Sequence, residues 1–458
     1  MKEAAWVATA FAILPRRLIA QSGRPPPSET VRLAAIGCGN MAWGDIQSLA
    51  GCGTSFVGLC DVDERQAVNT RKRFPKAAFF KDFRVMLDVL DKQIDGVLVA
   101  TPDHIHAVAA MAAITRGKHV YCEKPLAHTV GEVRALMAAA KKHKVITQLG
   151  NQEHASETIR LFREWVQAGV LGNIREIHCW APSVYSHMDK LDVLNEVHEV
   201  PKELDWELWQ GPVSPRRAYH PEFLPRTWRA WSPYGTSTAG DWMCHVLDPS
   251  FWALDLGAPE SVTVEEVNGW NPVKHALTFP KGDIIRYDFA AKNGRAPVTV
   301  RWFDGLSAAK VPRPEGLESD RPFSAHGKEK KEQHPGAVVY GDKGVLIHGS
   351  HGAGELRVIP EKVMRELKSS GALPPRSLPR VKGGHRNEWV QCIRDNTPAG
   401  SDFSAYGGPL SEIALIGLAA MQEPEKKLLW DADAGVFKNS QAATARLRKT
   451  YQPGWDPT

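Results

Sequence analysis

Long apolar runs are missing from this sequence of 458 residues: no stretch reaches the roughly 18 apolar residues that a membrane-spanning helix needs. We therefore expect no mature transmembrane span and no membrane partner. A strong charge bias is missing too, because 57 lysines and arginines face 52 aspartates and glutamates, an excess of +5 spread along the chain. Nucleic acid is not an expected partner of such a chain.

Cysteine is scarce and scattered. The chain has 7 cysteines, an odd number, and no two of them form a C-x-x-C pair, which argues against a disulfide framework and against a zinc site. His104 and His106 form an H-x-H pair, but no acidic or cysteine cluster with ligand spacing accompanies them. We predict no metal site.

The first 30 residues are interpreted as a leader and linker. An apolar stretch, Ala4 to Leu14, follows Lys2 and precedes a proline-rich segment, and it resembles the apolar region of a signal peptide. Arg16 and Arg17 follow that stretch instead of preceding it, so this is not an ordered twin-arginine signal. We expect export of a prefolded protein to the periplasm, which fits the unpaired cysteines, in preference to cytoplasmic residence.

What is present is typical of a large globular protein. With 43% hydrophobic and 24% charged residues the chain can bury a substantial core, and its length favours two domains. Residues 31–150 alternate short β-rich runs with helical stretches, as a Rossmann-type, doubly wound parallel sheet of an α/β protein requires. The strands are predicted at Val31–Ile36, Phe56–Cys60, Gly96–Ala100, Lys118–Cys122 and Val145–Leu149.

Residues 151–458 are predicted to form an α+β domain for substrate binding and oligomerisation. Most of its strands follow one another with little helix between them, which indicates a mostly antiparallel, open sheet. These strands are expected at Ile174–Trp180, Val262–Val267, Ile284–Ala290, Pro297–Trp302, Ala337–Gly341 and Val345–His348. The proline-, glycine- and charge-rich segments 306–335 and 361–384 are predicted to be surface excursions. The helical segment Leu410–Met421 is expected to pack back on the rest of the molecule.

A glycine turn joins the first predicted strand to a helix. Gly37, Gly39 and Ala42 occupy the small positions of G-x-G-x-x-[GA], with Asn40 and Met41 between them. In a dinucleotide fold these positions allow the tight turn, the approach of backbone to pyrophosphate, and close packing of helix on strand. The free N–H groups of the helix then bind phosphate. We predict that this turn binds a dinucleotide.

An acidic residue ends the second predicted strand, at the distance where it closes the βαβ unit and binds the adenosine ribose. This residue is Asp61. Its carboxylate would repel a 2′-phosphate, so NAD is the expected cofactor. Arg65, four residues later, keeps NADP open as an alternative.

Two loops leave the predicted strands Gly96–Ala100 and Lys118–Cys122 at the edge where such sheets bind ligands. The first, Ala100–His106, offers Thr101, Pro102 and His106 to the cofactor. The second, Tyr121–Leu126, offers Glu123 and Lys124. Lys124 is expected to lie beside the nicotinamide, where burial and the positive ring lower a lysine pKa. It would bind or deprotonate a substrate hydroxyl.

Asp241 and His245 are four residues apart in a predicted helix, so they share one face and aim at one hydroxyl. Because histidine titrates near neutral pH, His245 is the predicted general base in oxidation and general acid in reduction. Asp241 would hold His245 or a neighbouring hydroxyl, and Lys124 would polarise the reacting oxygen. An exchange of roles between Lys124 and His245 stays open.

Tryptophan is dense just before and after that helix. Flat aromatic faces pack on sugar rings while charged and amide groups bind their hydroxyls, so a sugar or cyclitol is the expected ligand. Most of these tryptophans are expected in the core or in an oligomer interface. The predicted substrate-binding residues are Gln152, His154, Trp231, Trp242, Asp241 and His245.

The ordered set of GCGNMA, Asp61, TPDHIH, EKP at Glu123–Pro125, and GDWMCH at Gly240–His245 resembles the Gfo/Idh/MocA oxidoreductase family, which is named for glucose-fructose oxidoreductase and inositol dehydrogenase. The resemblance runs from Val31 to the end of the sequence. It implies a Rossmann domain, then an α+β domain whose open sheet supports oligomers, so we expect a homo-oligomer. It also matches Lys124 to the family's EKP lysine, and Asp241 and His245 to its D-x-x-x-H pair.

The expected activity is that of an NAD- or NADP-dependent oxidoreductase, moving hydride between nicotinamide and a secondary hydroxyl or ketone of a sugar, glycoside or cyclitol. An NAD-dependent glycoside hydrolase, working by transient oxidation and elimination, is an alternative, as is a retained cofactor that cycles between two sugars. A non-catalytic NAD-binding protein is a further alternative. The pattern does not identify the sugar or the carbon that is oxidised.

Overall fold

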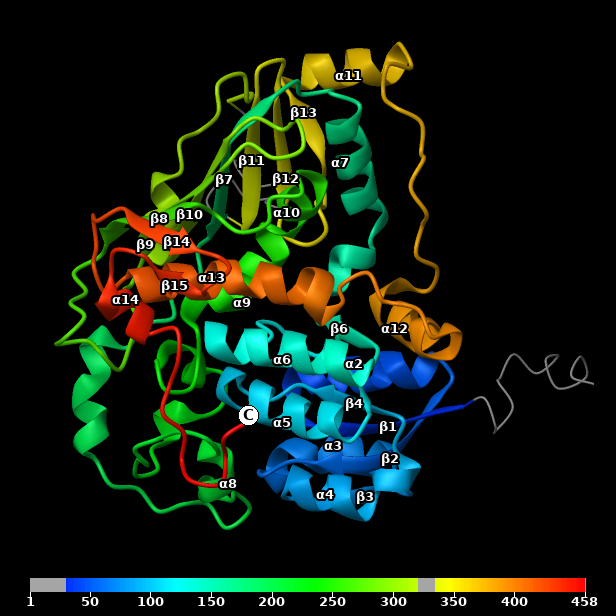
Figure 1. The fold of residues 1–458 in the computed structure, drawn as a ribbon, viewed down its shortest axis with the longest axis vertical. Coiled ribbons are helices and arrows are strands. Elements are labelled where there is room, and N and C mark those ends of the chain that lie inside the picture. The colour runs from blue at the N-terminus through cyan, green and yellow to red at the C-terminus, as the bar shows by residue number, and fades with distance from the viewer. Residues whose placement is uncertain (1–29, 320–333, 458) are drawn as a thin grey trace, which may run out of the picture.

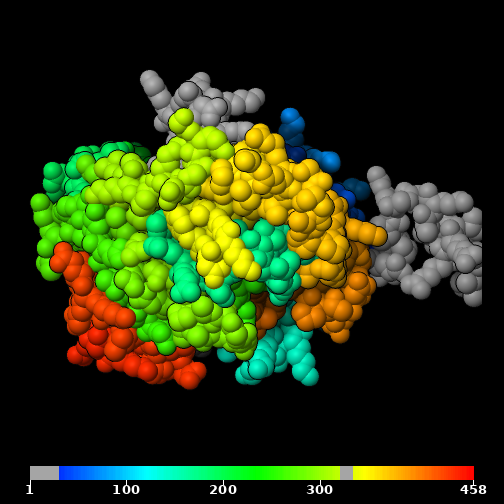
Figure 2. Space-filling model, turned by 90° about the horizontal axis from the view of Figure 1, so that it is seen from above, coloured from blue at the N-terminus to red at the C-terminus, as the bar shows by residue number. Residues whose placement is uncertain are grey.

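The computed structural model describes residues 30–319 and 334–457. The predicted leader and most of its linker, and the basic run Lys328–Lys331, lie outside these residues. Two sheets organise the described chain, one in each predicted domain (Figure 1). The space-filling view from above shows mainly the green, yellow and orange surface of the second domain, because it lies on top of the first along the long axis (Figure 2).

The first sheet has six parallel strands in the order β3-β2-β1-β4-β5-β6, which confirms the predicted Rossmann-type sheet. The strands are β1 (Val31–Ile36), β2 (Thr54–Cys60), β3 (Ala78–Phe80), β4 (Gly96–Val99), β5 (His119–Cys122) and β6 (Thr147–Leu149). Every residue of β4 is buried, as a parallel strand with helices on both faces requires. The chain order reverses between β1 and β4, so their carboxyl ends open a crevice there.

Five helices connect these strands. They are α2 (Asn40–Gly51), α3 (Glu64–Arg73), α4 (Phe83–Val89), α5 (Asp103–Thr115) and α6 (Val130–His143). Their starts follow capping chemistry: Asp63 caps α3, Asp82 caps α4, and Thr129 and Glu132 form a capping box at α6. The start of α2 has no side-chain cap, which leaves its backbone N–H groups for a ligand.

The second sheet has nine strands in the order β13-β12-β11-β7-β10-β9-β8-β14-β15. Its strands are β7 (Ile174–Ala181), β8 (Ser261–Val267), β9 (Asp283–Phe289), β10 (Val298–Asp304), β11 (Gly336–Gly341), β12 (Val345–Gly349), β13 (Arg357–Ile359), β14 (Leu428–Asp431) and β15 (Val436–Phe437). All neighbouring strands of this sheet pair antiparallel except β7 with β10. This confirms the mostly antiparallel sheet.

Helices of the second part of the chain join the two sheets. They are α7 (Glu157–Gln167), α8 (Trp206–Gln210), α9 (Ser237–Val246), α10 (Asp248–Ala253), α11 (Glu361–Ser369), α12 (Gly384–Asp395), α13 (Gly408–Ala420) and α14 (Gln441–Ala445). Trp389 of α12 is fully buried in one cluster with Leu33 of β1 and Tyr121 of β5. A second apolar cluster runs from Val99 of β4 through Met243 of α9 to Leu415 of α13. The core is therefore continuous between the domains.

The segments predicted as surface excursions carry more structure than expected. Residues 361–369 form α11, a largely exposed helix in which Met364 is buried. Val311 and Leu317 pack over Trp180 in a small apolar cluster of their own. Within the described ranges, no helix has both the length and the apolar character to cross a membrane.

Candidate functional site

A single cavity of about 990 Å³ opens at the carboxyl ends of the Rossmann strands and reaches α9 of the second domain. Ligand pockets run from about 300 to about 1,000 Å³, so this one has room for a large ligand. Many predicted site residues line it: Gly37, Gly39, Asn40, Met41, Asp61, Arg65, Thr101, Pro102, Glu123, Lys124, Asp241, Trp242 and His245. The two halves of the sequence thus meet at one place.

The glycine turn forms one end of this cavity. Gly37 has φ +91°, and a Cβ atom there would lie 2.4 Å from the carbonyl oxygen of Ala100. A Cβ on Gly39 would lie 2.8 Å from the side-chain oxygen of Gln66. Only glycine fits at Gly37, and the uncapped start of α2 faces the space that remains. Ala42 is fully buried in α2 and serves packing, as predicted for the third small position.

Asp61 lies next to the turn, at the end of β2. It accepts hydrogen bonds from the backbone N–H groups of Cys38 and Asp63, both at 2.9 Å. Burial raises its pKa to about 6. Each carboxylate oxygen keeps a lone pair for a ribose hydroxyl. The glycine cradle and this carboxylate together fit the phosphates and ribose of a dinucleotide.

Arg65 lines the cavity, but its charge is already paired. Its Nε and Nη2 donate to the two oxygens of Asp63 at 2.8 and 2.7 Å. The ion pair offsets the attraction that this guanidinium would offer to a 2′-phosphate.

Lys124 and Asp241 join the domains across the cavity. The Lys124 Nζ donates to the Asp241 carboxylate at 2.6 Å and to its backbone oxygen at 2.7 Å. Arg229 Nε donates to the same carboxylate oxygen at 3.0 Å, and the Tyr185 hydroxyl donates to the other at 3.0 Å. Burial alone would raise the pKa of Asp241, but Lys124 and Arg229 outweigh it and hold the pKa well below its usual range. Asp241 was expected to hold His245 or a neighbouring hydroxyl; its carboxylate contacts Lys124, Arg229 and the Tyr185 hydroxyl in place of His245.

His245 lies one helical turn beyond Asp241 and also faces the cavity. Its ring stacks on His351 with centroids 4.2 Å apart, at 26°. Burial, then the charges of Lys124 and His351, lower the pKa of His245 well below its ordinary value. The ring is therefore neutral at physiological pH, and the expectation that it titrates near neutrality is corrected by its burial beside a cation.

Asp103 was not predicted as a site residue, yet it lines the cavity at the start of α5. The Thr236 hydroxyl donates to it at 2.5 Å. Burial raises its pKa to about 7. A buried carboxyl beside Lys124 and Asp241 is the kind of group that sequence spacing cannot identify, since its surroundings come from the second domain.

Glu123 is buried directly behind Lys124. Gln152 donates to its carboxyl group at 2.5 Å. Burial and the neighbouring Asp45 raise the pKa of Glu123 well above its usual range. Arg386 of α12 in turn pairs with Asp45 through Nε at 2.6 Å. Glu123 thus anchors the loop that carries Lys124, through its hydrogen bond with Gln152.

Several predicted residues do not line the cavity. The His106 ring bridges the carbonyl oxygens of Thr101 and Pro125, both at 2.8 Å, and so braces the two loops from behind. His154 contacts Asp248 at 2.9 Å, and Gln152 supports Glu123 from outside the cavity lining. Trp231 is buried in an aromatic cluster with Phe223 and Tyr234. These four residues support the site and do not face its ligand space.

A cover from the second domain, residues 203–205 and Trp455, lies against the cofactor end, and the sequence did not predict it. The Asp205 N–H donates to the carbonyl oxygen of Val62 at 2.9 Å, and the Glu64 N–H donates to that of Glu203 at 3.2 Å. Trp455 also lines the cavity, with the guanidinium of Arg84 4.1 Å from its ring centroid. Figure 1 shows the green segment around α8 and the red C-terminal segment on this side of the Rossmann domain. The tryptophan-rich composition of this segment was the available signal.

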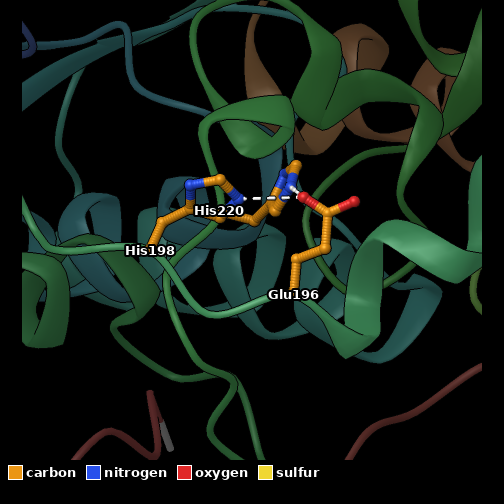
Figure 3. Close-up of side chains that lie close together, drawn as sticks. All are labelled: Glu196, His198 and His220. Atoms are coloured by element: carbon orange, nitrogen blue, oxygen red, sulfur yellow. Dashed lines mark hydrogen bonds and ion pairs between the residues drawn. The ribbon is translucent and has the colours of Figure 1, made fainter.

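A Glu-His-His cluster lies apart from the cavity lining (Figure 3). It consists of Glu196, His198 and His220, with Glu196 accepting at 3.0 and 3.3 Å from the Nε2 atoms of the two rings. Nδ1 of His220 accepts the backbone N–H of Glu222 at 3.0 Å. The ring proton of a neutral His220 therefore sits on Nε2 and points at the carboxylate, where a metal ligand would need a lone pair. This geometry is that of a hydrogen-bonded cluster.

Comparison with protein families gives two matches in the same order as the domains. Residues 31–151 match the Gfo/Idh/MocA model described as "Oxidoreductase family, NAD-binding Rossmann fold". Residues 158–287 match the model described as "Oxidoreductase family, C-terminal alpha/beta domain".

Curated relatives include sugar and cyclitol dehydrogenases. The chain is 27% identical over 269 residues to the rhizopine catabolism protein MocA of Rhizobium meliloti, covering 56% of this chain and 81% of that protein. It is 31% identical over 116 residues to levoglucosan dehydrogenase of Pseudarthrobacter phenanthrenivorans, covering 25% and 29%. It is 30% identical over 155 residues to inositol 2-dehydrogenase 1 of Saccharopolyspora erythraea, covering 33% and 45%. The matches to the two dehydrogenases thus span less than half of those proteins.

Solved structures share the fold over most of the chain. Levoglucosan dehydrogenase in complex with NADH and levoglucosan aligns with a TM-score of 0.54 at 19% identity, covering 86% of this chain and 98% of that one. The WlbA dehydrogenase of Bordetella pertussis, in complex with NADH and UDP-GlcNAcA, aligns with a TM-score of 0.58 at 15% identity, covering 88% and 100%. At these identities the likeness shows the fold alone.

Proposed function

The chain belongs to the Gfo/Idh/MocA oxidoreductase family and carries its NAD-binding Rossmann domain, and from this premise we propose that it moves hydride between NAD and a secondary hydroxyl or ketone of a sugar, glycoside or cyclitol. One observation carries the proposal. Lys124 of the first domain meets Asp241 of the second at 2.6 Å in a cavity that His245 and the glycine turn also line. Two relatives, an inositol 2-dehydrogenase and a levoglucosan dehydrogenase, support the proposed substrate class.

Lys124 is assigned as the group that binds and polarises the reacting oxygen. Two of its N–H groups are used on Asp241, so the third is left for the substrate. The Lys124 ammonium group is buried and ion-paired with Asp241, and a positive charge in such a place stabilises the alkoxide that develops during oxidation.

His245 is assigned as the proton acceptor in oxidation and the donor in reduction. Its neutral state, enforced by burial and by Lys124, leaves a ring nitrogen able to accept a proton. The nicotinamide, when bound, supplies the hydride acceptor or donor. A charged amine and a neutral imidazole in one cavity support this division of roles over the reverse one.

NAD is the proposed cofactor in preference to NADP. The Asp61 carboxylate and the Asp63 carboxylate both lie at the ribose end, and the nearby Arg65 charge is paired with Asp63. A 2′-phosphate there would meet net negative charge.

A second candidate function keeps the cofactor bound throughout. The enzyme would then either pass hydride between two sugars or oxidise one sugar transiently during hydrolysis. The contact of residues 203–205 with residues 62–64, and Trp455 in the cavity lining, favour this candidate, because both add second-domain groups around the cofactor end that would slow exchange. Release of free sugar without net NADH would identify the hydrolase, and paired oxidised and reduced sugars would identify the cycling enzyme.

The test uses Lys124→Ala and His245→Ala, with the exposed Lys142→Ala on α6 as the control. Turnover of a panel of glycosides and cyclitols is followed by NADH absorbance and by product mass. Each site variant should lose at least about 100-fold in turnover, since each removes a group that acts on the reacting proton or oxygen. NAD binding, measured by calorimetry, should survive in all three. Normal turnover in both site variants would refute the proposal.

A further inference from the structure

The substrate end of the cavity holds many hydrogen-bond donors and few free acceptors. From this imbalance we infer that the sugar substrate carries an anionic group, a carboxylate or a phosphate, which Arg226 and Arg229 bind. The inference rests on the proposed function and specifies its substrate class.

The Asp241 carboxylate at this end already accepts three hydrogen bonds from its neighbours. One oxygen of Asp241 accepts from Lys124 and Arg229, and the other accepts from Tyr185. A carboxylate oxygen offers about two acceptor sites, so little capacity remains for a substrate hydroxyl. The ligand has to bring acceptors of its own.

Arg229 keeps unused hydrogen-bond donors, and its guanidinium packs on Trp228. Only its Nε is engaged among the described residues, which leaves both terminal NH₂ groups. The guanidinium carbon lies 4.3 Å from the ring centroid of Trp228, a cation–π contact that sets the plane of the fork. The side chain is only 24% exposed.

Arg226 is presented to the cavity by a strained turn. The Thr227 N–H donates to the carbonyl oxygen of Pro225 at 2.7 Å, and Arg226 between them has φ +67° and ψ −39°. These angles form a γ-turn of the rarer, strained hand, which a non-glycine residue adopts at a cost. Within residues 30–319 and 334–457, no carboxylate pairs with this exposed guanidinium, although it lines the cavity.

The charge balance at this end is therefore positive. Lys124, Arg226 and Arg229 face Asp241, and the other two carboxyls have raised pKa values: Asp103 at about 7 through burial, and Glu123 through burial and Asp45. Neutral hydroxyls would leave these cations uncompensated in a partly buried site. A carboxylate or phosphate is acceptor-only and matches the guanidinium fork in a bidentate pair.

The pyrophosphate of NAD is the other anion that Arg226 and Arg229 could bind. The experiment distinguishes it from a sugar anion by measuring sugar binding to protein that already holds NADH. Methyl β-glucoside, methyl β-glucuronide and glucose 6-phosphate are compared for kcat/KM and for binding to the NADH-loaded protein by calorimetry. We expect one of the two acids to exceed the neutral glycoside by at least about tenfold in both measures, the value of one charged hydrogen bond. Which acid prevails decides between carboxylate and phosphate.

Arg226→Gln should raise KM for that acid by about 10- to 100-fold with a smaller effect on kcat, because the arginine binds away from the reacting oxygen. The KM of Arg226→Lys should lie between those of the parent and Arg226→Gln, since lysine keeps the positive charge but cannot form the bidentate pair. Lys202→Gln removes an equal charge from an exposed position of the same cover that does not line the cavity, and should leave KM unchanged. NAD affinity should be equal in all of them.

Equal kcat/KM for neutral and acidic sugars, or weaker NAD binding by Arg226→Gln with unaltered sugar binding, would overturn the inference. Tight binding of an acid that depends on Arg226, without any redox reaction, would refute the proposed function and support the anion site.

Discussion

At the scale of single residues, Asp61 is expected to determine the affinity of the cavity for NAD and its discrimination against NADP. The residue is buried at the end of β2 and holds two backbone N–H groups. Asp61→Ala should weaken NAD binding by about tenfold or more, because ribose hydroxyls lose a charged acceptor, and should relax discrimination against NADP. Calorimetric titration with both nucleotides measures this, with the exposed Asp88→Ala as the control.

The same residue gives a pH dependence. Burial raises the pKa of the Asp61 carboxyl to about 6 in the free protein, so the acceptor is lost as the pH falls through about 6. NAD affinity should therefore decrease between pH 7.5 and pH 5, and this decrease should be absent in Asp61→Ala. Unchanged NAD affinity in the variant would remove Asp61 from the ribose site.

Residue types and their spacing predicted which groups meet at the cavity, but not which groups hold them. Lys124, Asp241 and His245 could be identified from strand ends and a four-residue helical spacing. His106 and His154 could not be separated from ligand-binding histidines, because their partners are a distant carbonyl of Pro125 and the carboxylate of Asp248. Arg226 was not among the predicted site residues, since the turn that presents it leaves no signal in the sequence.

At the scale of elements, β9 and β10 share a buried carboxyl pair. Asp283 begins β9 and Asp304 ends β10, and the Asp283 N–H donates to the Asp304 carboxyl at 3.2 Å. Burial raises the pKa of Asp304 to about 7, and burial and Asp304 raise that of Asp283 well above its usual range. The folded protein therefore retains protons that the unfolded chain releases near pH 4.

This pair should make the sheet less stable as the pH rises. The contribution of Asp304 is fully present below about pH 4 and is lost as the pH rises to about 7, which amounts to roughly 4 kcal/mol for a pKa raised from near 4 to about 7. Urea unfolding between pH 4.5 and pH 8 should show a flatter profile for Asp283→Asn than for the parent, whereas the exposed Glu260→Gln should keep the parent slope. Parallel profiles for Asp283→Asn and the parent would contradict the assignment.

Element prediction succeeded where a run was long enough to show its period. The first strand was predicted with the bounds that β1 has, and the predicted second strand lacks only the first two residues of β2. The short strands β3 and β15 were not predicted, because two or three residues carry no periodic signal. The helix α11 was predicted to be an irregular excursion, because proline and glycine flank a short, mostly exposed segment.

At the scale of the whole molecule, the two domains share a core and a buried ion pair. Leu415 of α13 belongs to the same apolar cluster as Val99 of β4, and Lys124 binds Asp241 across the boundary. Calorimetry should therefore show one unfolding transition, with agreement between calorimetric and van't Hoff enthalpies. NAD at about 100 times its Kd should stabilise the whole transition by about 2.7 kcal/mol. Two transitions, only one of them responding to NAD, would show that the domains unfold separately.

Composition and the family resemblance predicted both sheets, and the helical segment Leu410–Met421 was predicted to pack back, as Leu415 of α13 does against the shared core. The ion pair of Lys124 with Asp241 lay beyond sequence reasoning. The homo-oligomer and export from the cell remain predictions. The sheet strands carry a ladder of ion pairs in which Arg301 contacts Glu265 and Glu176, a polar pattern that an interface would have to satisfy.

The backbone pairing of residues 203–205 with residues 62–64 has one mechanical consequence. The same covalent segment runs from this pairing through α8 to the turn that carries Arg226 and on to Arg229. A displacement wide enough to admit or release a dinucleotide at Asp61 therefore pulls the arginines away from their anion as well. We therefore expect the sugar to dissociate before the nucleotide does.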